Sequence, residues 1–170
     1  MLVYLIGFMG SGKTTVGKKL ANKLGFQFVD LDDLFESEMQ QSISEYFNIY
    51  GEVVFREKEQ QILKRTFEMS DCVISCGGGT PCFYDNMKLI NQNGISVYIS
   101  MAAISLFYRL KNARNKRPLI SNMNDDALFE YITDELSKRE LYYNQSVINI
   151  KGESIDVEEL RKMIDKHIVL

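Results

Sequence analysis

Short apolar runs alternate along this chain with longer stretches in which apolar residues recur every three or four positions. The short runs are typical of buried strands and cover residues 2–6, 26–30, 72–75, 95–99 and 147–150. The longer stretches predict helices over residues 16–24, 51–69, 103–111 and 125–143, with further helical segments ending near Asn91 and His167. Strands separated by helices predict an α/β fold, a mostly parallel sheet covered by helices on both faces.

The turn after the first strand carries the most specific motif. Residues 7–14 read Gly-Phe-Met-Gly-Ser-Gly-Lys-Thr and match G-x-x-x-x-G-K-[ST], the phosphate-binding loop of nucleoside triphosphate enzymes. The motif lies between a strand and a helix, as it must if the backbone N–H groups of the loop and the helix start are to bind phosphate. A glycine-rich turn that binds nothing is the alternative. We expect the nucleotide-binding residues to be Gly10, Ser11, Gly12, Lys13, Thr14 and Thr15.

Size and composition fit one globular domain spanning residues 1–170. The net charge of −3 argues against a general nucleic-acid binder, which usually carries a basic surface. No apolar run approaches the roughly 20 residues that span a bilayer, and the N-terminus enters the first strand without room for a signal peptide. We therefore expect a cytoplasmic protein that binds no membrane. Three cysteines without a C-x-x-C pair and a single histidine disfavour a zinc site, a disulfide framework or a serine–histidine hydrolase.

Two further groups of polar or glycine residues directly follow predicted strands. Asp30 and Asp32 follow the second strand, where one carboxylate is placed to hold Mg²⁺ through water and the other to accept a hydrogen bond from an alcohol. Capping of a helix N-terminus, together with Asp33, is the alternative. Gly77–Gly79 follow the third strand and can present bare N–H groups to a ligand, or can form a flexible turn.

Five basic residues fall within nine positions of this net acidic chain. Around a nucleotide site, such a stretch is typical of a mobile lid that neutralises phosphate charge and excludes water. A solvated basic surface or a weak nucleic-acid patch is the alternative. The residues are Arg109, Lys111, Arg114, Lys116 and Arg117.

Six motifs in order resemble the shikimate kinase family, and together they cover nearly the whole chain. They are residues 7–17, the F-x-D-x-D of 28–32, the G-E-x-x-F-R-x-x-E of 51–59, the glycines 77–79, the R-P-L of 117–119, and Arg139 with Tyr143. The resemblance implies a kinase fold like that of nucleoside monophosphate kinases, with strand order 2-3-1-4-5. It also implies an acceptor-binding region near residues 31–60 and a lid near residues 112–124.

The same resemblance implies the reaction, in which Mg-ATP phosphorylates the 3-hydroxyl of shikimate to give shikimate 3-phosphate and ADP. This step lies in the route to chorismate and the aromatic amino acids. On the nucleotide side, the resemblance places Lys13 and Arg117 on the transferring phosphate, and Thr14 and Asp30 on Mg²⁺, directly or through water. It also implies a monomer.

On the acceptor side, the resemblance makes Asp32 the residue that binds the ring hydroxyls and the candidate base. Arg56 and Arg139 would clamp the carboxylate of shikimate, and Gly78 and Gly79 would line the pocket. A carboxylate for hydroxyl groups and guanidinium groups for an anion suit this acceptor chemically.

The residues that contact adenine stay open between Arg109 and Arg114. Residues 151–154 lack the proline that often packs on adenine in the family. Three other functions remain alternatives: a kinase for gluconate, a kinase for a nucleotide acceptor, and a nucleotide-binding regulator without catalysis. The combination of Asp32, Arg56, Arg139 and the glycine triplet favours shikimate, because a gluconate kinase should not need all of them.

Overall fold

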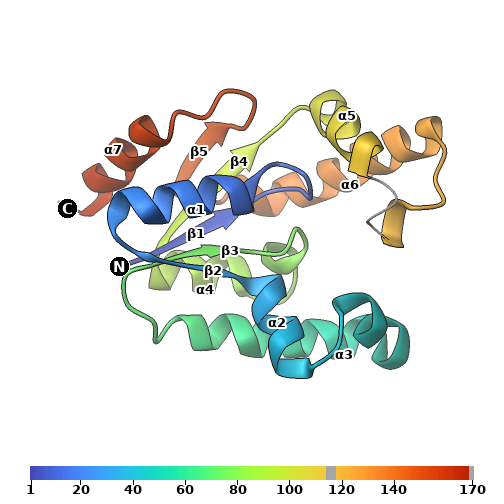
Figure 1. The fold of residues 1–170 in the computed structure, drawn as a ribbon, viewed down its shortest axis with the longest axis horizontal. Coiled ribbons are helices and arrows are strands. Elements are labelled where there is room, and N and C mark those ends of the chain that lie inside the picture. The colour runs from blue at the N-terminus through green and yellow to red at the C-terminus, as the bar shows by residue number, and fades with distance from the viewer. Residues whose placement is uncertain (114–117, 169–170) are drawn as a thin grey trace.

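A computed structural model describes residues 1–113 and 118–168 of the chain. Across these residues the chain forms one sheet of five parallel strands in the order β2-β3-β1-β4-β5 (Figure 1). The expected parallel sheet and strand order are confirmed. The strands are β1 Leu2–Ile6, β2 Gln27–Asp30, β3 Cys72–Ser75, β4 Ile95–Ser100 and β5 Ile148–Lys151. Because parallel strands all end at one edge of a sheet, the loops that follow β1, β2 and β3 meet there.

Helices cover both faces of this sheet, and the side chains of β1 alternate between them. Tyr4 and Ile6 belong to the larger apolar core, which α2 to α6 complete. Val3 and Leu5 belong to the smaller core, which α1 and α7 complete. The helices are α1 Lys13–Leu24, α2 Leu31–Met39, α3 Ile43–Thr66, α4 Asn86–Asn93, α5 Ala103–Ala113, α6 Asp125–Tyr143 and α7 Val157–Ile168, with 3-10 helices η1 Thr80–Cys82 and η3 Pro118–Ile120.

The segment between β2 and β3 differs most from the sequence-based expectation. Residues 31–39 form the separate helix α2, which the sequence indicated only through the aspartates that can cap a helix start. The helix α3 begins at a capping box formed by Ser42 and Glu45, and Gly51 interrupts it with a positive φ of 78°. The expected helix from residue 51 is therefore its second part, and it ends at Thr66 rather than near residue 69.

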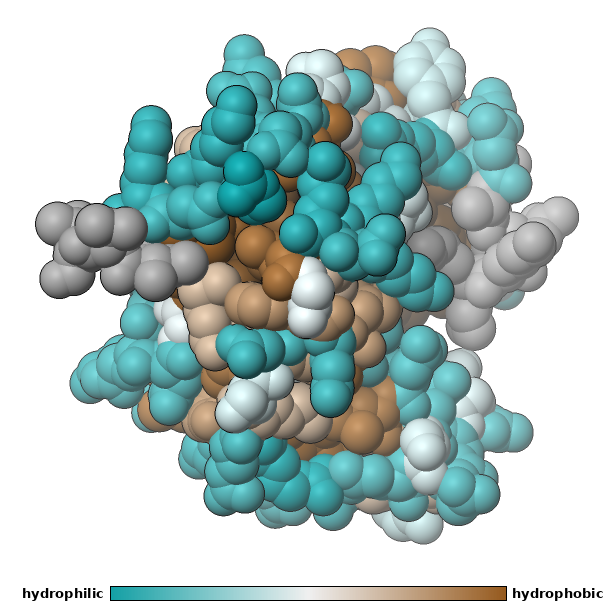
Figure 2. All heavy atoms as spheres, turned by 60° about the vertical axis from the view of Figure 1, so that its left-hand side comes forward, coloured by the Kyte–Doolittle hydropathy of each residue, from teal (hydrophilic) through white to brown (hydrophobic). Residues whose placement is uncertain are grey.

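The sequence of the expected helix 51–69 predicts a loose apolar stripe, and this prediction is correct in part. The stripe consists of Val54, Phe55, Ile62, Leu63 and Phe67. Phe55, Ile62 and Leu63 are buried, but Val54 is 40% exposed. Val54 lies three residues after the break at Gly51. Residues on both sides of this break pack on the core, Ile43, Tyr46 and Phe47 before it and Phe55 after it. Seen from the side that carries the termini, polar side chains cover most of the surface and apolar atoms show between them (Figure 2). Among the described helices, none has the length and apolar character needed to cross a membrane.

Candidate active site

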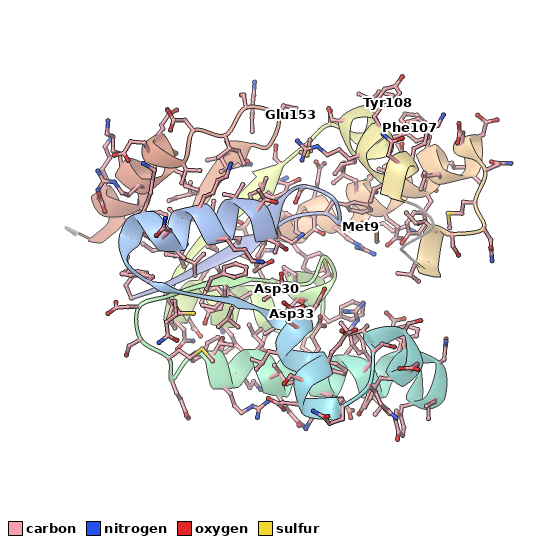
Figure 3. The ribbon with its side chains drawn as sticks, viewed as in Figure 1. Met9, Asp30, Asp33, Phe107, Tyr108 and Glu153 are labelled. Carbon is pink, nitrogen blue, oxygen red and sulfur yellow. The ribbon has the colours of Figure 1, made fainter. Side chains whose placement is uncertain are left out.

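A cavity of about 320 Å³ opens where β1, β2 and β3 end. Its walls come from the phosphate loop, the β2–α2 junction and the loop after β3, so the sheet topology assembles it from segments far apart in sequence. Figure 3 shows Met9 on the phosphate loop and Asp30 and Asp33 at the start of α2. The lining residues are Met9, Gly10, Gly12, Lys13, Thr14, Thr15, Asp30, Asp32, Ser75, Cys76, Gly77 and Gly78.

The phosphate loop has a backbone that requires glycine. Gly10 and Gly12 have φ values of 81° and 98°, in the left-handed region where a β-carbon is strained. Gly12 is the N-cap of α1, so the unpaired N–H groups of the first helical turn face the cavity that this turn helps to line. The Nζ of Lys13 donates hydrogen bonds to the main-chain oxygens of Gly7 and Phe8, at 2.8 and 3.0 Å. These bonds hold the lysine charge at the loop.

Ser11 and Thr15 occupy different surroundings within the predicted nucleotide-binding set. Thr15 lines the cavity and is exposed. Ser11 is only 1% exposed, and its main-chain N–H donates to the oxygen of Phe8 at 3.2 Å. The Ser11 side chain therefore packs inside the loop rather than on the cavity surface.

Thr14 and Asp30 are joined by a direct hydrogen bond. The Thr14 hydroxyl donates to Oδ2 of Asp30 at 2.9 Å, and Oδ1 of Asp30 accepts from the main-chain N–H of Asp32 at 3.2 Å. Asp30 thus caps α2 and also turns a carboxylate oxygen toward the phosphate loop. Hydroxyl and carboxylate oxygens are suitable ligands for Mg²⁺, which in kinases takes one or two protein oxygens and completes its shell with phosphates and water.

Asp32 lies in an environment that favours its protonated form. Burial is the main cause that raises the pKa of Asp32 to about 6, and the nearby charges of Asp30 and Glu59 act in the same direction. The charge of Lys13 opposes them. A β-carbon added at Gly77 would lie 2.9 Å from Oδ1 of Asp32, so the glycine leaves room for this carboxylate. A carboxylate with a pKa near neutral pH is well suited to accept a proton.

Arg56 is held on the far side of the glycine triplet by several contacts. Its Nη1 donates to Oε2 of Glu59 at 2.8 Å, and Oε1 of Glu59 accepts from the hydroxyl of Thr80 at 2.6 Å. A β-carbon at Gly79 would lie 2.7 Å from Nη2 of Arg56, so only glycine admits the guanidinium group here. Gly79 therefore contacts Arg56, while it does not line the cavity itself.

Arg139 approaches the same triplet from α6. Its Nη2 donates to Oε2 of Glu135 at 2.6 Å, and a β-carbon at Gly78 would lie 3.5 Å from its Nη1. One turn further along α6, the buried Tyr143 donates its hydroxyl hydrogen to the oxygen of Gly78 at 2.5 Å. Arg139 and Tyr143, four residues apart on α6, share one face of the helix, and both contact the glycine loop.

The two arginines share a neighbour in Cys82, which is half-buried after the glycine triplet. Burial raises the pKa of the Cys82 thiol to about 11, against the opposing charges of Arg139 and Arg56. The geometry that brings the two guanidinium groups together is their contact with neighbouring glycines, Arg139 with Gly78 and Arg56 with Gly79. Cys72 and Cys76 are buried packing residues, as the sequence indicated.

The predicted lid is only partly described. Arg109 donates from Nη1 to the main-chain oxygens of Gly10 and Ser11, both at 3.3 Å, so it lies on the phosphate loop. Arg114, Lys116 and Arg117 lie outside the described residues. The loop after β5 is tied to the start of α5, because Glu153 accepts from the N–H of Ala102 at 3.0 Å (Figure 3).

Sequence reasoning gave no role to Glu59 or Thr80, although Glu59 belongs to a quoted motif. Glu59 is 4% exposed and connects Arg56 to Thr80. The available signal was its position three residues after Arg56 on a helix, a spacing at which opposite charges meet.

The fold and the nucleotide site are those of a P-loop kinase. The strand order and the phosphate loop between β1 and α1 define the fold, and the hydrogen-bonded pair of Thr14 and Asp30 lies beside that loop. A family model described as "Shikimate kinase" matches residues 9–168. The chain belongs to the shikimate kinase family.

Individual relatives match over almost their full length. A shikimate kinase of Phocaeicola vulgatus is 37% identical, covering 96% of this chain and 98% of the relative. A shikimate kinase of Bacteroides fragilis is 38% identical, covering 98% of this chain and 97% of the relative. The crystal structure of shikimate kinase from Bacteroides thetaiotaomicron superposes with a TM-score of 0.91 at 36% identity, over 100% of this chain and 99% of that one. A shikimate kinase from Acinetobacter baumannii, solved in complex with shikimate, gives a TM-score of 0.85 at 30% identity. The match covers 99% of this chain and 92% of that one.

Proposed function

We propose that this protein transfers the γ-phosphoryl group of ATP to the 3-hydroxyl of shikimate, giving shikimate 3-phosphate and ADP. The reaction belongs to the route to chorismate and the aromatic amino acids. One observation carries the proposal: Arg56 and Arg139 flank the glycine triplet, which also contacts Asp32. A small polyol with one carboxylate matches two guanidinium groups beside one hydroxyl-binding aspartate.

In the nucleotide half, the main chain of residues 10–15 and the Lys13 ammonium group would hold the phosphates. Arg117, outside the described residues, would neutralise the transferring phosphate together with Lys13. Arg109 already contacts the main chain of Gly10 and Ser11. This contact supports Arg109, rather than Arg114, as the arginine on the adenine side.

Thr14 and Asp30 would hold Mg²⁺, Thr14 through its hydroxyl and Asp30 directly or through water. The hydrogen bond between them at 2.9 Å shows that both oxygens reach one point beside the loop. When bound, Mg²⁺ neutralises phosphate charge and orients the chain of phosphates for transfer.

In the acceptor half, Asp32 would accept the proton of the 3-hydroxyl as the new bond to phosphorus forms. Arg56 and Arg139 would bind the carboxylate of shikimate. The N–H group of Gly78 would line the pocket, and Gly79 would leave the space that the guanidinium group of Arg56 occupies. Because the transition state of phosphoryl transfer is loose, the protein contributes mainly by positioning the two substrates and stabilising charge. Two fixed guanidinium groups supply such positioning at the end of the acceptor away from Asp32.

We further propose that residues 1–170 act as a single domain and as a monomer in the cytoplasm. The acceptor-binding region would span about residues 31–60, and the lid about residues 112–124. One continuous sheet with an apolar core on each face supports the single domain.

A coupled ADP-release assay with Mg-ATP tests the proposed function. The acceptors are shikimate, gluconate, AMP and none, each at matched concentration. We expect ADP formation that depends on shikimate alone. ADP formation with gluconate or AMP alone would keep the kinase but overturn the assignment of Asp32, Arg56 and Arg139. Tight ATP binding without turnover on any acceptor would favour a regulator.

A further inference from the structure

Each of the two arginines at the glycine triplet lies over an aromatic ring. The Cζ atom of Arg56 lies 4.1 Å from the ring centroid of Phe83 and 4.8 Å from that of Phe55. The Cζ atom of Arg139 lies 5.2 Å from the ring centroid of Phe8. Guanidinium groups within about 6 Å of a ring centroid are attracted to the ring face. The three rings therefore support the two guanidinium groups, Phe83 and Phe55 that of Arg56 and Phe8 that of Arg139.

The support of Arg139 differs from that of Arg56 because it belongs to the phosphate loop. Phe8 is 1% exposed, so its ring is fixed by its surroundings. Its main-chain oxygen accepts hydrogen bonds from Nζ of Lys13 at 3.0 Å and from the N–H of Ser11 at 3.2 Å. One residue therefore shapes the phosphate loop with its backbone and faces Arg139 with its side chain.

The following residue brings the same loop against the acceptor side. The main-chain nitrogen of Met9 lies 3.3 Å from the position that a β-carbon at Gly78 would take, and Nη1 of Arg139 lies 3.5 Å from it. Gly78 also accepts the hydrogen bond from Tyr143. The phosphate loop, the glycine triplet and α6 thus meet at one point, where a β-carbon would crowd the main chain of Met9.

Arg139 needs support from outside its own helix. Arg139 forms an ion pair with Glu135, one turn earlier on α6. This ion pair restrains the guanidinium group only relative to its own helix. The Arg139 side chain is 17% exposed, so its contacts are largely shielded from water. Cation–π contacts are stronger when desolvated than when exposed. The ring of Phe8 connects Arg139 to the nucleotide site, because Phe8 belongs to the phosphate loop.

We propose that Phe8 is a positioning residue for acceptor binding, acting through Arg139. Its ring holds the guanidinium group where the carboxylate of the acceptor binds, so the loop that binds phosphate also sets the place of the second substrate. This inference rests on the proposed function, because it takes Arg139 as a ligand of the acceptor carboxylate.

A double-mutant cycle isolates the contact. Phe8→Leu removes the ring and keeps an apolar side chain, and kcat/KM for shikimate is measured in the wild-type, Arg139→Lys and Arg56→Lys backgrounds. In the wild type we expect a loss of about fivefold in kcat/KM for shikimate, with the KM for ATP changed by less than about twofold, since the main chain of the loop is retained. The loss should disappear in Arg139→Lys and persist in Arg56→Lys.

Phe83→Leu is the matched control, because it removes the ring under the other arginine without touching the phosphate loop. The loss of kcat/KM for shikimate caused by Phe83→Leu should disappear in the Arg56→Lys background and persist in the Arg139→Lys background. A loss from Phe8→Leu that is the same in all three backgrounds, or that appears equally in the KM for ATP, would overturn the inference.

Thermal unfolding checks that each variant is folded, and Phe8→Met replaces Phe8→Leu if the latter does not fold. The two proposals fail in different ways. A wild-type protein without shikimate-dependent turnover refutes the proposed function and this inference with it. A wild-type protein that phosphorylates shikimate, with additive effects of Phe8→Leu and Arg139→Lys, refutes the inference alone.

Discussion

Glu59 holds Arg56 in place with one carboxylate oxygen and accepts from the hydroxyl of Thr80 with the other, at 2.8 and 2.6 Å. The bond to Arg56 lies within α3, while the bond to Thr80 reaches the 3-10 helix η1 after the glycine triplet. A buried carboxylate with both oxygens occupied fixes the guanidinium group more firmly than an exposed pair would. The position of Arg56 therefore depends on Glu59.

Replacing Glu59 should weaken acceptor binding without affecting the nucleotide. Glu59→Gln keeps the shape of the side chain but removes the charge that holds Arg56. We expect the KM for shikimate to rise about tenfold, the equivalent of one charge-assisted hydrogen bond. Steady-state kinetics in both substrates measure this effect. Glu57→Gln, an exposed position on the same helix, is the control and should behave as the wild type. Equal KM values in the two variants would contradict the role of Glu59.

A methyl group at Gly79 should displace Arg56 directly. Gly79 has a φ of −91°, which alanine adopts freely. Gly79→Ala therefore tests the steric effect of an added β-carbon and introduces no backbone strain. The added β-carbon would lie 2.7 Å from Nη2 of Arg56. We expect the KM for shikimate to rise about fivefold or more, with the KM for ATP retained. Titration calorimetry with shikimate checks the same change at equilibrium, and unaltered affinity would show that Arg56 does not bind the acceptor.

The pH dependence of turnover should report on Asp32. Its pKa is raised to about 6, first by burial and then by the charges of Asp30 and Glu59. A base acts when it is ionised, so kcat/KM for shikimate should fall as the pH is lowered through about 6 and level off above it. Because Glu59 contributes to the raised pKa, Glu59→Gln should move this midpoint to lower pH. A profile that is flat between pH 5 and 8 in the wild type would exclude Asp32 as the base.

The same raised pKa predicts a gain in stability from Asp32→Asn. The folded-state pKa lies above the ordinary value of 3.8, so the stabilisation from Asp32 is complete below that value and is lost as the pH rises through about 6. At pH 7.5 the wild type therefore contains a partly desolvated charge that asparagine lacks. Because the Asp32 side chain is also partly exposed to solvent, we expect the free energy of unfolding of Asp32→Asn to exceed that of the wild type by only about 1 kcal/mol at pH 7.5 and by little at pH 4. Urea unfolding at both pH values measures the difference, and a less stable variant at pH 7.5 would contradict the raised pKa.

Lys13→Ala should abolish most turnover while the fold survives. The ammonium group donates to the main chain of the phosphate loop and is the charge nearest the predicted phosphates. Loss of one preorganised charge in such a site costs about 100- to 1,000-fold in kcat. Lys19→Ala, on the exposed face of α1, is the control. Near-normal turnover in a folded Lys13→Ala protein would mean that the loop does not bind the transferring phosphate.

The sequence predicted the parts of the fold that depend on local patterns. The buried run of residues 2–6, the phosphate loop and the helix that follows it are all readable from neighbouring residues. The strand order came from the family resemblance, since no local pattern specifies which strands pair. Val54 was wrongly assigned to the apolar stripe, since the pattern did not reveal the break in the helix at Gly51, three residues earlier. The helix of residues 31–39 was missed because the aspartates at its start were considered mainly as ligands.

The candidate site was predictable as a set of residues but not as a set of contacts. The hydrogen bond of Thr14 to Asp30 follows from two strand ends meeting at one sheet edge, and was within reach of sequence reasoning. The stacking of Arg139 on Phe8 was not, because the two residues belong to a loop and a helix that only tertiary packing brings together. Asp30 also shows that capping a helix and facing a nucleotide site are compatible roles for one carboxylate.

The most direct test of the central claim is the identity of the phosphorylated product. The protein is incubated with Mg-ATP and shikimate, and the product is examined by two-dimensional phosphorus–proton NMR. The account predicts one new phosphorus resonance besides ADP, coupled to the ring proton at carbon 3 of shikimate. A phosphorus resonance coupled to another ring position, or only ADP and inorganic phosphate, would contradict the arrangement of Asp32, Arg56 and Arg139 around this acceptor.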